Sequence, residues 1–162
     1  MTDTSTVIVR FAGPEDWETW RDLRLRALQD TPSAFGSTYE REVGYDRSRW
    51  VERLANPDGV SVLAWIRDTA VGMGAGFQDL PAFLHVVAMW TDPAYRSRGV
   101  GSAVLTAIER WAGERGLRLH IEVNVANAGA RALYERAGYA GTGEVRPLRD
   151  GSDERIERMV HG

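Results

Sequence analysis

Hydrophobic and polar positions along the chain follow two different spacings, and segments of the two kinds alternate. Short runs that are apolar, or alternate with polar residues, are typical of strands, whereas apolar residues recurring every three or four positions are typical of helices. The first spacing predicts strands over residues 6–12, 60–67, 70–78, 82–91, 117–123, 139–145 and 154–161. The second predicts helices over residues 14–29, 46–56, 99–115 and 127–137. Together they indicate an α/β protein with a mixed sheet.

The order of these elements predicts part of the sheet topology. The strands at 60–67, 70–78 and 82–91 are separated by short turns, which favours an antiparallel meander. The helix at 99–115 separates the strand at 82–91 from the strand at 117–123. A helical crossover of this kind joins parallel strands, so we expect those two strands to pair in parallel.

Two segments depart from regular patterns. Gly72, Gly74 and Gly76 lie within the strand at 70–78, and glycines in a strand indicate bulging or the close approach of another backbone. Residues 33–45 mix aromatic and charged side chains. One interpretation is a short helix and loop that cover the edge of the core, and the other is a substrate lid.

Composition narrows the class of protein. The chain has 162 residues and 43% hydrophobic residues, so we expect one globular domain over residues 1–162. It contains no cysteine, which excludes disulfides, thiolate nucleophiles and zinc–thiolate sites. All 20 positively charged side chains are arginines.

The sequence also bears on partners and location. The net charge of −3 gives no overall basic field that would attract nucleic acid. The start of the chain lacks the basic region and apolar segment of a signal peptide. The sequence also lacks an apolar run as long as a membrane span. We therefore expect a cytoplasmic protein with neither a nucleic acid nor a membrane as partner.

The stretch at 89–102 (MWTDPAYRSRGVGS) predicts an anion site. A strand ends there, a loop carries Arg96, Arg98, Gly99 and Gly101, and a helix begins. The first N–H groups of a helix have no partner within the helix, and the helix dipole adds partial positive charge. Glycines let a ligand approach the backbone, so a pyrophosphate fits such a loop. The stretch matches neither GxxxxGK[ST] nor GxGxxG, and a solvated turn before a helix is the alternative.

A second stretch, residues 124–139 (NVANAGARALYERAGY), begins another helix where a strand has ended. The Asn127 side chain is expected either to cap this helix or to hydrogen-bond an amide-bearing ligand. Arg131 and Tyr134 follow at four and seven residues, which predicts that all three side chains share one helical face. The tyrosine hydroxyl is then expected at the mouth of a cleft; a core tyrosine is the alternative.

These two stretches resemble the two signatures of the GNAT superfamily of N-acetyltransferases. The first carries Arg-x-x-Gly-x-Gly from Arg96 to Gly101, and the second carries Asn-x-x-Ala-x-x-Leu-Tyr-x-x-x-Gly-Tyr from Asn127 to Tyr139. The resemblance covers roughly residues 82–145. It implies a single GNAT domain with a mixed sheet of about seven strands and about four helices. It also implies a V-shaped splay between the fourth and fifth strands.

The resemblance implies acetyl-CoA as cosubstrate and no metal. The backbone N–H near Met89 would polarise the thioester carbonyl. Tyr134 would protonate the leaving thiolate. The residues implied to bind the cofactor are Met89, Trp90, Thr91, Arg96, Ser97, Arg98, Gly99, Val100, Gly101, Ser102, Asn127, Arg131 and Tyr134.

His85 and Glu122 are the candidates for a general base. His85 lies four residues before Met89 on the same predicted strand, so we expect both side chains on one face. A histidine accepts a proton near neutral pH, although a strand histidine bonded to a neighbour is the alternative. Glu122 lies near the end of the facing strand. Glu40 and Glu42 would hold a cationic acceptor or relay a proton.

The implied reaction is direct transfer of acetyl from acetyl-CoA to a primary amine of a small molecule or peptide within a ternary complex. A non-catalytic acyl-CoA-binding module is one alternative, and an O-acetyltransferase or longer-acyl enzyme is another. Trp90 is predicted to disfavour long acyl chains. A polyamine or aminoglycoside acceptor would need an acidic pocket, formed by Glu40, Glu42, Asp79 and Glu122. The sequence does not identify the acceptor, and it leaves a homodimer open.

Overall fold

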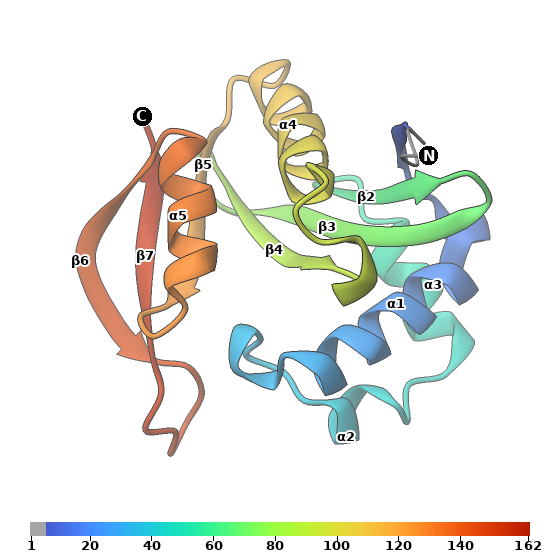
Figure 1. Cartoon of the computed structure of the whole chain (residues 1–162), viewed down its shortest axis with the longest axis horizontal. Coiled ribbons are helices and arrows are strands. Elements are labelled where there is room, and N and C mark those ends of the chain that lie inside the picture. Colours follow the sequence, from blue (N-terminus) through green and yellow to red (C-terminus); the bar gives the residue numbers. More distant parts are fainter. Residues whose placement is uncertain (1–5) are drawn as a thin grey trace.

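A computed structural model describes residues 6–162, which form a seven-stranded sheet with helices on both faces (Figure 1). The strand order is β1-β2-β3-β4-β5-β7-β6. Neighbouring strands run antiparallel except β4 and β5, which run parallel and are joined by helix α4. The strands are β1 (Val7–Phe11), β2 (Gly59–Ile66), β3 (Thr69–Leu80), β4 (Phe83–Thr91), β5 (Arg118–Asn124), β6 (Tyr139–Pro147) and β7 (Arg155–His161).

The helices follow the predicted helical spacings closely. They are α1 (Trp17–Asp30), α2 (Tyr39–Glu42), α3 (Arg47–Leu54), α4 (Val100–Gly113) and α5 (Ala128–Arg136). Short 3₁₀ turns cover Pro14–Asp16, Pro32–Ala34 and Pro93–Tyr95. The mixed sheet, the parallel β4–β5 pair and the seven strands confirm the predicted fold class. Within the described residues, no helix is long and apolar enough to cross a membrane.

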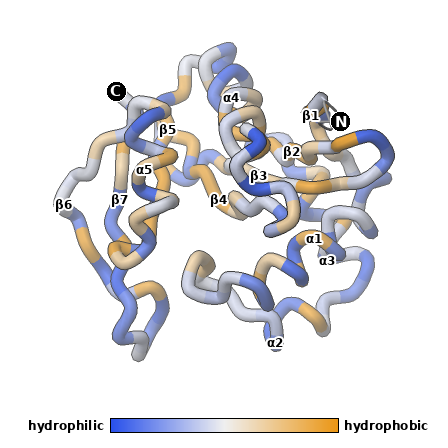
Figure 2. The backbone as a smooth tube through the Cα atoms, viewed as in Figure 1, coloured by the Kyte–Doolittle hydropathy of each residue, from blue (hydrophilic) through white to orange (hydrophobic). Residues whose placement is uncertain are grey.

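Two hydrophobic clusters fill the two sides of the sheet. Helices α4 and α5 lie over one face, and their apolar residues pack with Leu84, Val86 and Met159 of the strands. Helices α1 and α3 lie over the opposite face (Figure 1). Their tryptophans, Trp20 and Trp50, pack in a separate cluster with residues of β2, β3 and β4. In Figure 2 the hydrophobic colour runs along the central strands, whereas hydrophilic residues occupy the outer turns.

The parallel pair separates part-way along its length. The last paired residues are Val86 and Ile121, although β4 continues to Thr91 and β5 to Asn124. Beyond this point β4 keeps its pairing with β3, and β5 keeps its pairing with β7. The sheet therefore splits between its fourth and fifth strands in chain order, which confirms the predicted splay.

A bulge in β4 accompanies the split. Ala88 has a φ of 58°, and the β3–β4 register shifts so that Ala88 and Met89 together oppose Gly74. Gly74 also lets α4 approach the sheet. A Cβ added there would lie 2.6 Å from both the Met89 Sδ and the Val104 Cγ1. The glycine-rich β3 thus lies opposite a bulge in the neighbouring strand, and at Gly74 the close approach is made by side chains rather than by another backbone.

Residues 33–45 cover the edge of the core and are held there by hydrogen bonds. The Asn124 side chain donates to the Ser33 backbone oxygen at 2.9 Å, and the Arg149 guanidinium donates to the Phe35 backbone oxygen at 3.0 Å. Phe35 is buried in the cluster below α1. The structure therefore favours the first interpretation of this segment, a short helix and loop over the core edge, although its start also forms a wall of the site described below.

We predict that Gly74→Ala destabilises the protein while Gly113→Ala does not. The new methyl at position 74 overlaps Met89 and Val104, and overpacking of this kind costs about 1–3 kcal/mol. A Cβ at Gly113 in α4 meets nothing within 4 Å, so alanine there should leave stability unchanged or raise it by up to about 1 kcal/mol. Urea unfolding of both variants tests this, and equal midpoints would contradict it.

Candidate active site

A cavity of about 1350 Å³ lies where β4 and β5 separate. Its walls come from both halves of the sheet, the start of α4, one face of α5, and the α1 side of the molecule including Phe35. Sites for one small molecule usually measure about 300–1,000 Å³, so this cavity has room for two ligands side by side.

The start of α4 presents backbone N–H groups to this cavity. Gly99 is the residue before the helix and has a φ of 80°, a conformation that glycine adopts without strain. Within residues 6–162, no side chain caps this end of α4, so its first N–H groups stay available and the helix dipole adds positive charge. Ser97, Val100, Gly101 and Ser102 line the cavity beside Gly99. These residues form a cradle of the kind that holds a pyrophosphate.

The two arginines of the loop are placed differently. Arg96 lines the cavity, and its guanidinium donates to the Asp30 carboxylate at 2.7 Å. Asp30 also accepts from the Trp90 indole N–H at 3.0 Å, so the Trp90 side chain is held toward the end of α1. Arg98 lies outside the set of described residues that line the cavity, and its guanidinium sits 5.4 Å from the Tyr95 ring.

Helix α5 turns two of its three predicted residues toward the cavity. The side-chain oxygen of Asn127, Oδ1, caps the helix by accepting from the Ala130 N–H at 3.0 Å. The side-chain nitrogen, Nδ2, is then left to donate to a ligand in the cavity. Tyr134 lines the cavity, and burial raises the pKa of its hydroxyl, so it stays protonated. Arg131 instead pairs with Glu157 of β7 at 2.6 Å. The prediction that Arg131 shares the cavity face is therefore wrong, because this ion pair draws it to the sheet.

The bulge in β4 separates two residues that were expected on one face. Met89 packs with the α4 cluster, together with Leu84 and Val86. His85 lies between Leu84 and Val86, so alternation along the strand points it to the opposite face. The prediction that His85 and Met89 share a face is wrong because the extra residue at Ala88 reverses the alternation.

His85 occupies a half-buried position on the wall of the cavity. Its ring stacks on that of His120, with centroids 4.5 Å apart and planes inclined by 17°. Its Nδ1 lies 3.6 Å from the Asp79 carboxylate, and its Nε2 lies 3.4 Å from the Glu122 carboxylate. Burial, and then the neighbouring His120, lower the pKa of His85 against the opposite effect of the two carboxylates. A neutral imidazole at neutral pH is suited to accept a proton.

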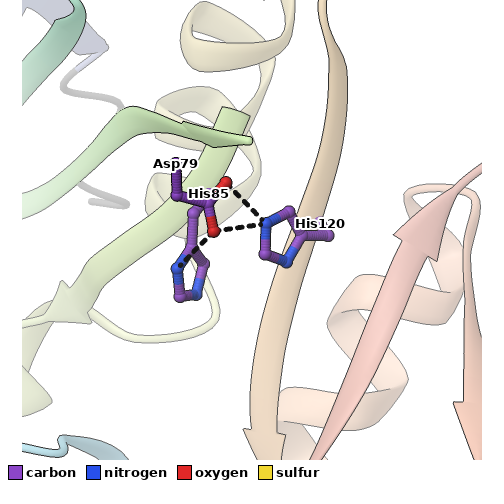
Figure 3. A group of neighbouring side chains, drawn as sticks. All are labelled: Asp79, His85 and His120. Atoms are coloured by element: carbon purple, nitrogen blue, oxygen red, sulfur yellow. Dashed lines mark hydrogen bonds and ion pairs between the residues drawn. The ribbon is translucent and has the colours of Figure 1, made fainter. Parts of the chain in front are cut away.

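Asp79, His85 and His120 form a cluster at the β3–β4 turn and β5 (Figure 3). Their ligand-type atoms lie within 4.8 Å of one another, a spacing that is compatible with a metal ion. The hydrogen bonds indicate a different use. Arg158 donates to the His120 Nδ1 at 3.3 Å, which assigns the proton to Nε2, and Nε2 faces the Asp79 carboxylate at 3.0 Å. In this arrangement Asp79 accepts from the His120 ring, and the stacked His85 ring lies beside them.

Glu122 also lines the cavity, but its carboxylate is engaged. Arg146 forms a bidentate ion pair with it, with N–O distances of 2.7 and 2.6 Å. The pairing occupies both carboxylate oxygens and neutralises the charge. Of the two predicted bases, His85 therefore has the freer acceptor atom.

The predicted acidic acceptor pocket is absent from the part of the chain that the structure describes. Glu122 is the sole carboxylate lining the cavity there. Glu42 is fully buried, with Arg24 bound to both of its oxygens at 3.0 Å and Arg53 at 2.9 Å. Its predicted role in holding a cationic acceptor is therefore wrong, because it is an internal counter-ion. Glu40 lies on the surface.

The family of this chain follows from comparison with known proteins. A model of the Acetyltransferase (GNAT) family matches residues 17–139, which include the split strands, the α4 cradle and α5. The chain belongs to the GNAT family of acetyltransferases.

Individual relatives agree with this assignment. This chain is 32% identical over 151 residues to a mycothiol acetyltransferase from Brachybacterium faecium. It is 28% identical over 137 residues to a mycothiol acetyltransferase from Nocardiopsis dassonvillei. The matches cover 86% and 80% of this chain but 42% and 41% of the relatives, so the chain spans about two fifths of their length.

Solved structures share the fold. The yncA protein from Salmonella typhimurium, solved with its cofactor acetyl-CoA, superposes with a TM-score of 0.78 at 16% identity. The match covers 96% of this chain and 93% of that one.

Sequence reasoning missed part of the His85 environment. His120 shares a β-ladder position with His85, since the two are Cα partners across β4 and β5. The predicted parallel pairing of these strands was the one signal that would have found it. Asp79 lies beside His85 at a second irregularity, a shift of the β3–β4 register between Gln78 and Leu80. The spacing of apolar residues in the sequence does not reveal this shift.

We predict that Glu42 stabilises the fold in a pH-dependent manner. Burial alone would raise its pKa, but the hydrogen bonds and charge of Arg24, with a further bond from Arg53, lower it from 4.5 to about 2. Because the folded pKa is the lower one, the stabilisation is present above pH 4.5 and is lost as the pH falls toward 2. Glu42→Gln should cost about 3–5 kcal/mol at pH 6, and the gap from wild type should narrow at pH 3. Urea unfolding at both pH values tests this, and a constant gap would refute it.

Proposed function

We propose that this protein is an acetyl-CoA-dependent N-acetyltransferase that acts on a primary amine. The observation that carries the proposal is the single cavity joining the α4 cradle, the split strands and the cavity-facing residues of α5. One part of that cavity suits a long phosphate-bearing cofactor, and the rest leaves room for an acceptor. The names of the acetyl-CoA-bound and mycothiol acetyltransferase relatives support the same activity.

The residues fit acetyl-CoA at three places. The cradle from Ser97 to Ser102 would hold the pyrophosphate, and the amide nitrogen of Asn127 would bind the pantetheine arm. The inner edge of β4 beyond Val86 has no strand beside it among the described residues, so it would pair with the extended arm. Acetyl-CoA supplies the acyl group as a thioester.

The bulge suits the proposed role of the backbone near Met89. Pairing with β5 ends at Val86, so a backbone N–H near the bulge that faces the split would be free to bind a ligand. A backbone donor fixed at that point would stabilise negative charge developing on the thioester carbonyl oxygen. Tyr134, protonated in its buried position, would donate to the departing thiolate.

His85 is our candidate for the group that removes a proton from the acceptor amine. An amine attacks only in its neutral form, and a base near its substrate supplies that form. With no cysteine in the chain, we propose direct transfer of the acetyl group between the two bound substrates.

We also propose that residues 1–162 form a single GNAT domain. A non-catalytic acyl-CoA-binding module is the alternative, and measurement of acetyl transfer distinguishes the two.

We predict that Ser102→Glu abolishes or strongly weakens acetyl-CoA binding. A carboxylate in the first turn of α4 is favourable for the helix but repels a pyrophosphate at the same N–H groups. Titration calorimetry should show micromolar binding to wild type and at least about tenfold weaker binding to the variant.

Thr106→Glu is the matched control for that experiment. Thr106 is exposed one turn along α4 and lies outside the described residues that line the cavity. It should bind acetyl-CoA like wild type. No binding by wild type would overturn the proposed function, and equal loss in both variants would reject the cradle as the site.

We predict that His85→Gln lowers kcat/KM by about 10²-fold or more with acetyl-CoA binding unchanged. Because burial lowers the pKa of His85, the neutral base is present at neutral pH. The acid limb of kcat/KM for wild type should therefore fall below pH 6.5, and the variant should lack it. Thiol release against pH measures both, and an unchanged limb in the variant would exclude His85.

A further inference from the structure

We propose that the acceptor is an amine that also carries a carboxylate, and that Arg53 binds this carboxylate at the far end of the cavity from His85. The inference rests on the proposed function, since it concerns the second substrate of the same site. It follows from the residues that line the cavity on the α1 side of the sheet, from their charges, and from the strand spacing between Gly59 and His85.

The cavity lining reaches beyond the cofactor cradle to residues of α1 and α3, and we call this part the acceptor arm. Its floor is a row of sheet residues that includes Ser61, Ala75 and His85. These residues alternate with apolar residues that face α4, so they point to the opposite face of the sheet. The arm ends at Arg53 and Asn56, which also line the cavity.

The far end of the acceptor arm carries one net positive charge. Glu42 sits between Arg24 and Arg53 and is fully buried, so it cannot contact an acceptor itself. The pKa of Glu42 is lowered to about 2, which keeps it ionised, and arginines stay charged at any physiological pH. Two guanidinium groups against one carboxylate leave a single excess cation.

Arg53 is the member of this set that is suited to a ligand. Its side chain is 34% exposed, compared with 12% for Arg24. Arg24 uses two nitrogens on Glu42, whereas Arg53 uses only one. The rings of Tyr45 and Trp50 lie 5.1 Å from its guanidinium and hold it in place. A guanidinium with remaining N–H donors, fixed on a cavity wall, matches a carboxylate.

At the other end of the acceptor arm the arginine that lines the cavity, Arg146, is paired, and the Asp79 carboxylate lies 3.6 Å from the His85 Nδ1. Glu122 is neutralised by the bidentate Arg146, and the lowered pKa of His85 keeps that imidazole neutral at neutral pH. An amine reaching His85 therefore meets a neutral imidazole that can accept its proton. A polyamine would place a second cation against Arg53, so the charges disfavour the polycationic acceptors.

The sheet register sets the distance between the two ends. Gly59 pairs with Phe77, and Phe77 pairs with His85, so the three residues lie in one row across β2, β3 and β4. Strands lie about 4.8 Å apart, which places Gly59 roughly 10 Å from His85. Asn56 contacts the Gly59 end and lies three residues after Arg53. Side chains reach inward from both ends, so we expect the amine and carboxylate roughly 6–10 Å apart.

That separation favours a short peptide over a single amino acid. One residue spans at most about 3.6 Å, two about 7 Å and three about 11 Å. The test is thiol release from acetyl-CoA with alanine, dialanine and trialanine as free acids, with dialanine and trialanine amides, and with spermidine. We expect the free-acid peptides to exceed both alanine and the matching amides by about tenfold or more in kcat/KM.

Arg53→Gln is the variant that tests the residue. It should raise KM for the free-acid peptides about tenfold and leave the amides unchanged, because the amides have no carboxylate to lose. Arg53→Lys, which keeps the charge and the pair with Glu42, should restore part of the preference. Arg41→Gln is the control, since it removes the same charge from an exposed position outside the described cavity lining.

The outcomes separate this inference from the proposed function. Failure of wild type to bind acetyl-CoA in calorimetry would defeat the proposed function itself. Binding of acetyl-CoA with equal use of acids and amides, with preference for spermidine, or with no turnover of any free-acid peptide would defeat the inference alone. An equal KM change for acids and amides in Arg53→Gln would assign Arg53 a structural role only.

Discussion

The end of hydrogen bonding between β4 and β5 after Val86 and Ile121 is the constraint on which the site depends. Each strand continues along its outer neighbour, so its backbone groups stay paired on one side and turn unpaired toward the split on the other. An open strand edge is costly on a surface, but inside a cavity it provides a row of donors and acceptors for an extended ligand. The cradle at α4 and the face of α5 adjoin this edge because α4 and α5 cover the same face of the sheet.

The bulge at Ala88 connects packing with chemistry. It turns Met89 into the α4 cluster and leaves His85 on the opposite face, so the proposed cofactor and acceptor sides of the cavity would be divided at one residue of β4. Gly74 makes this possible, since any Cβ there would occupy the space of Met89 and Val104. The glycine is thus a structural requirement of the site, although it is not among the described residues that line the cavity.

Ion pairs between arginines and carboxylates determine the charge along the cavity. Two carboxylates near it are held by arginines, Glu42 by Arg24 and Arg53, and Glu122 by Arg146. A sequence with more acidic than basic residues therefore builds a cavity lined by several arginines and one carboxylate. Net charge alone indicates the opposite character, because it does not record which carboxylates are buried as counter-ions.

The sequence by itself determined the α/β order, the parallel crossover and both GNAT signatures, because these follow from local periodicity and from motifs within short stretches. Tyr134, Asn127 and the α4 cradle could be predicted for that reason. Only the tertiary structure decided that Arg131 turns to Glu157, that Glu42 is internal and that His85 stacks on His120. Those facts depend on pairing between residues far apart in the chain and on one inserted residue in β4, which reverses alternation without leaving a local signal.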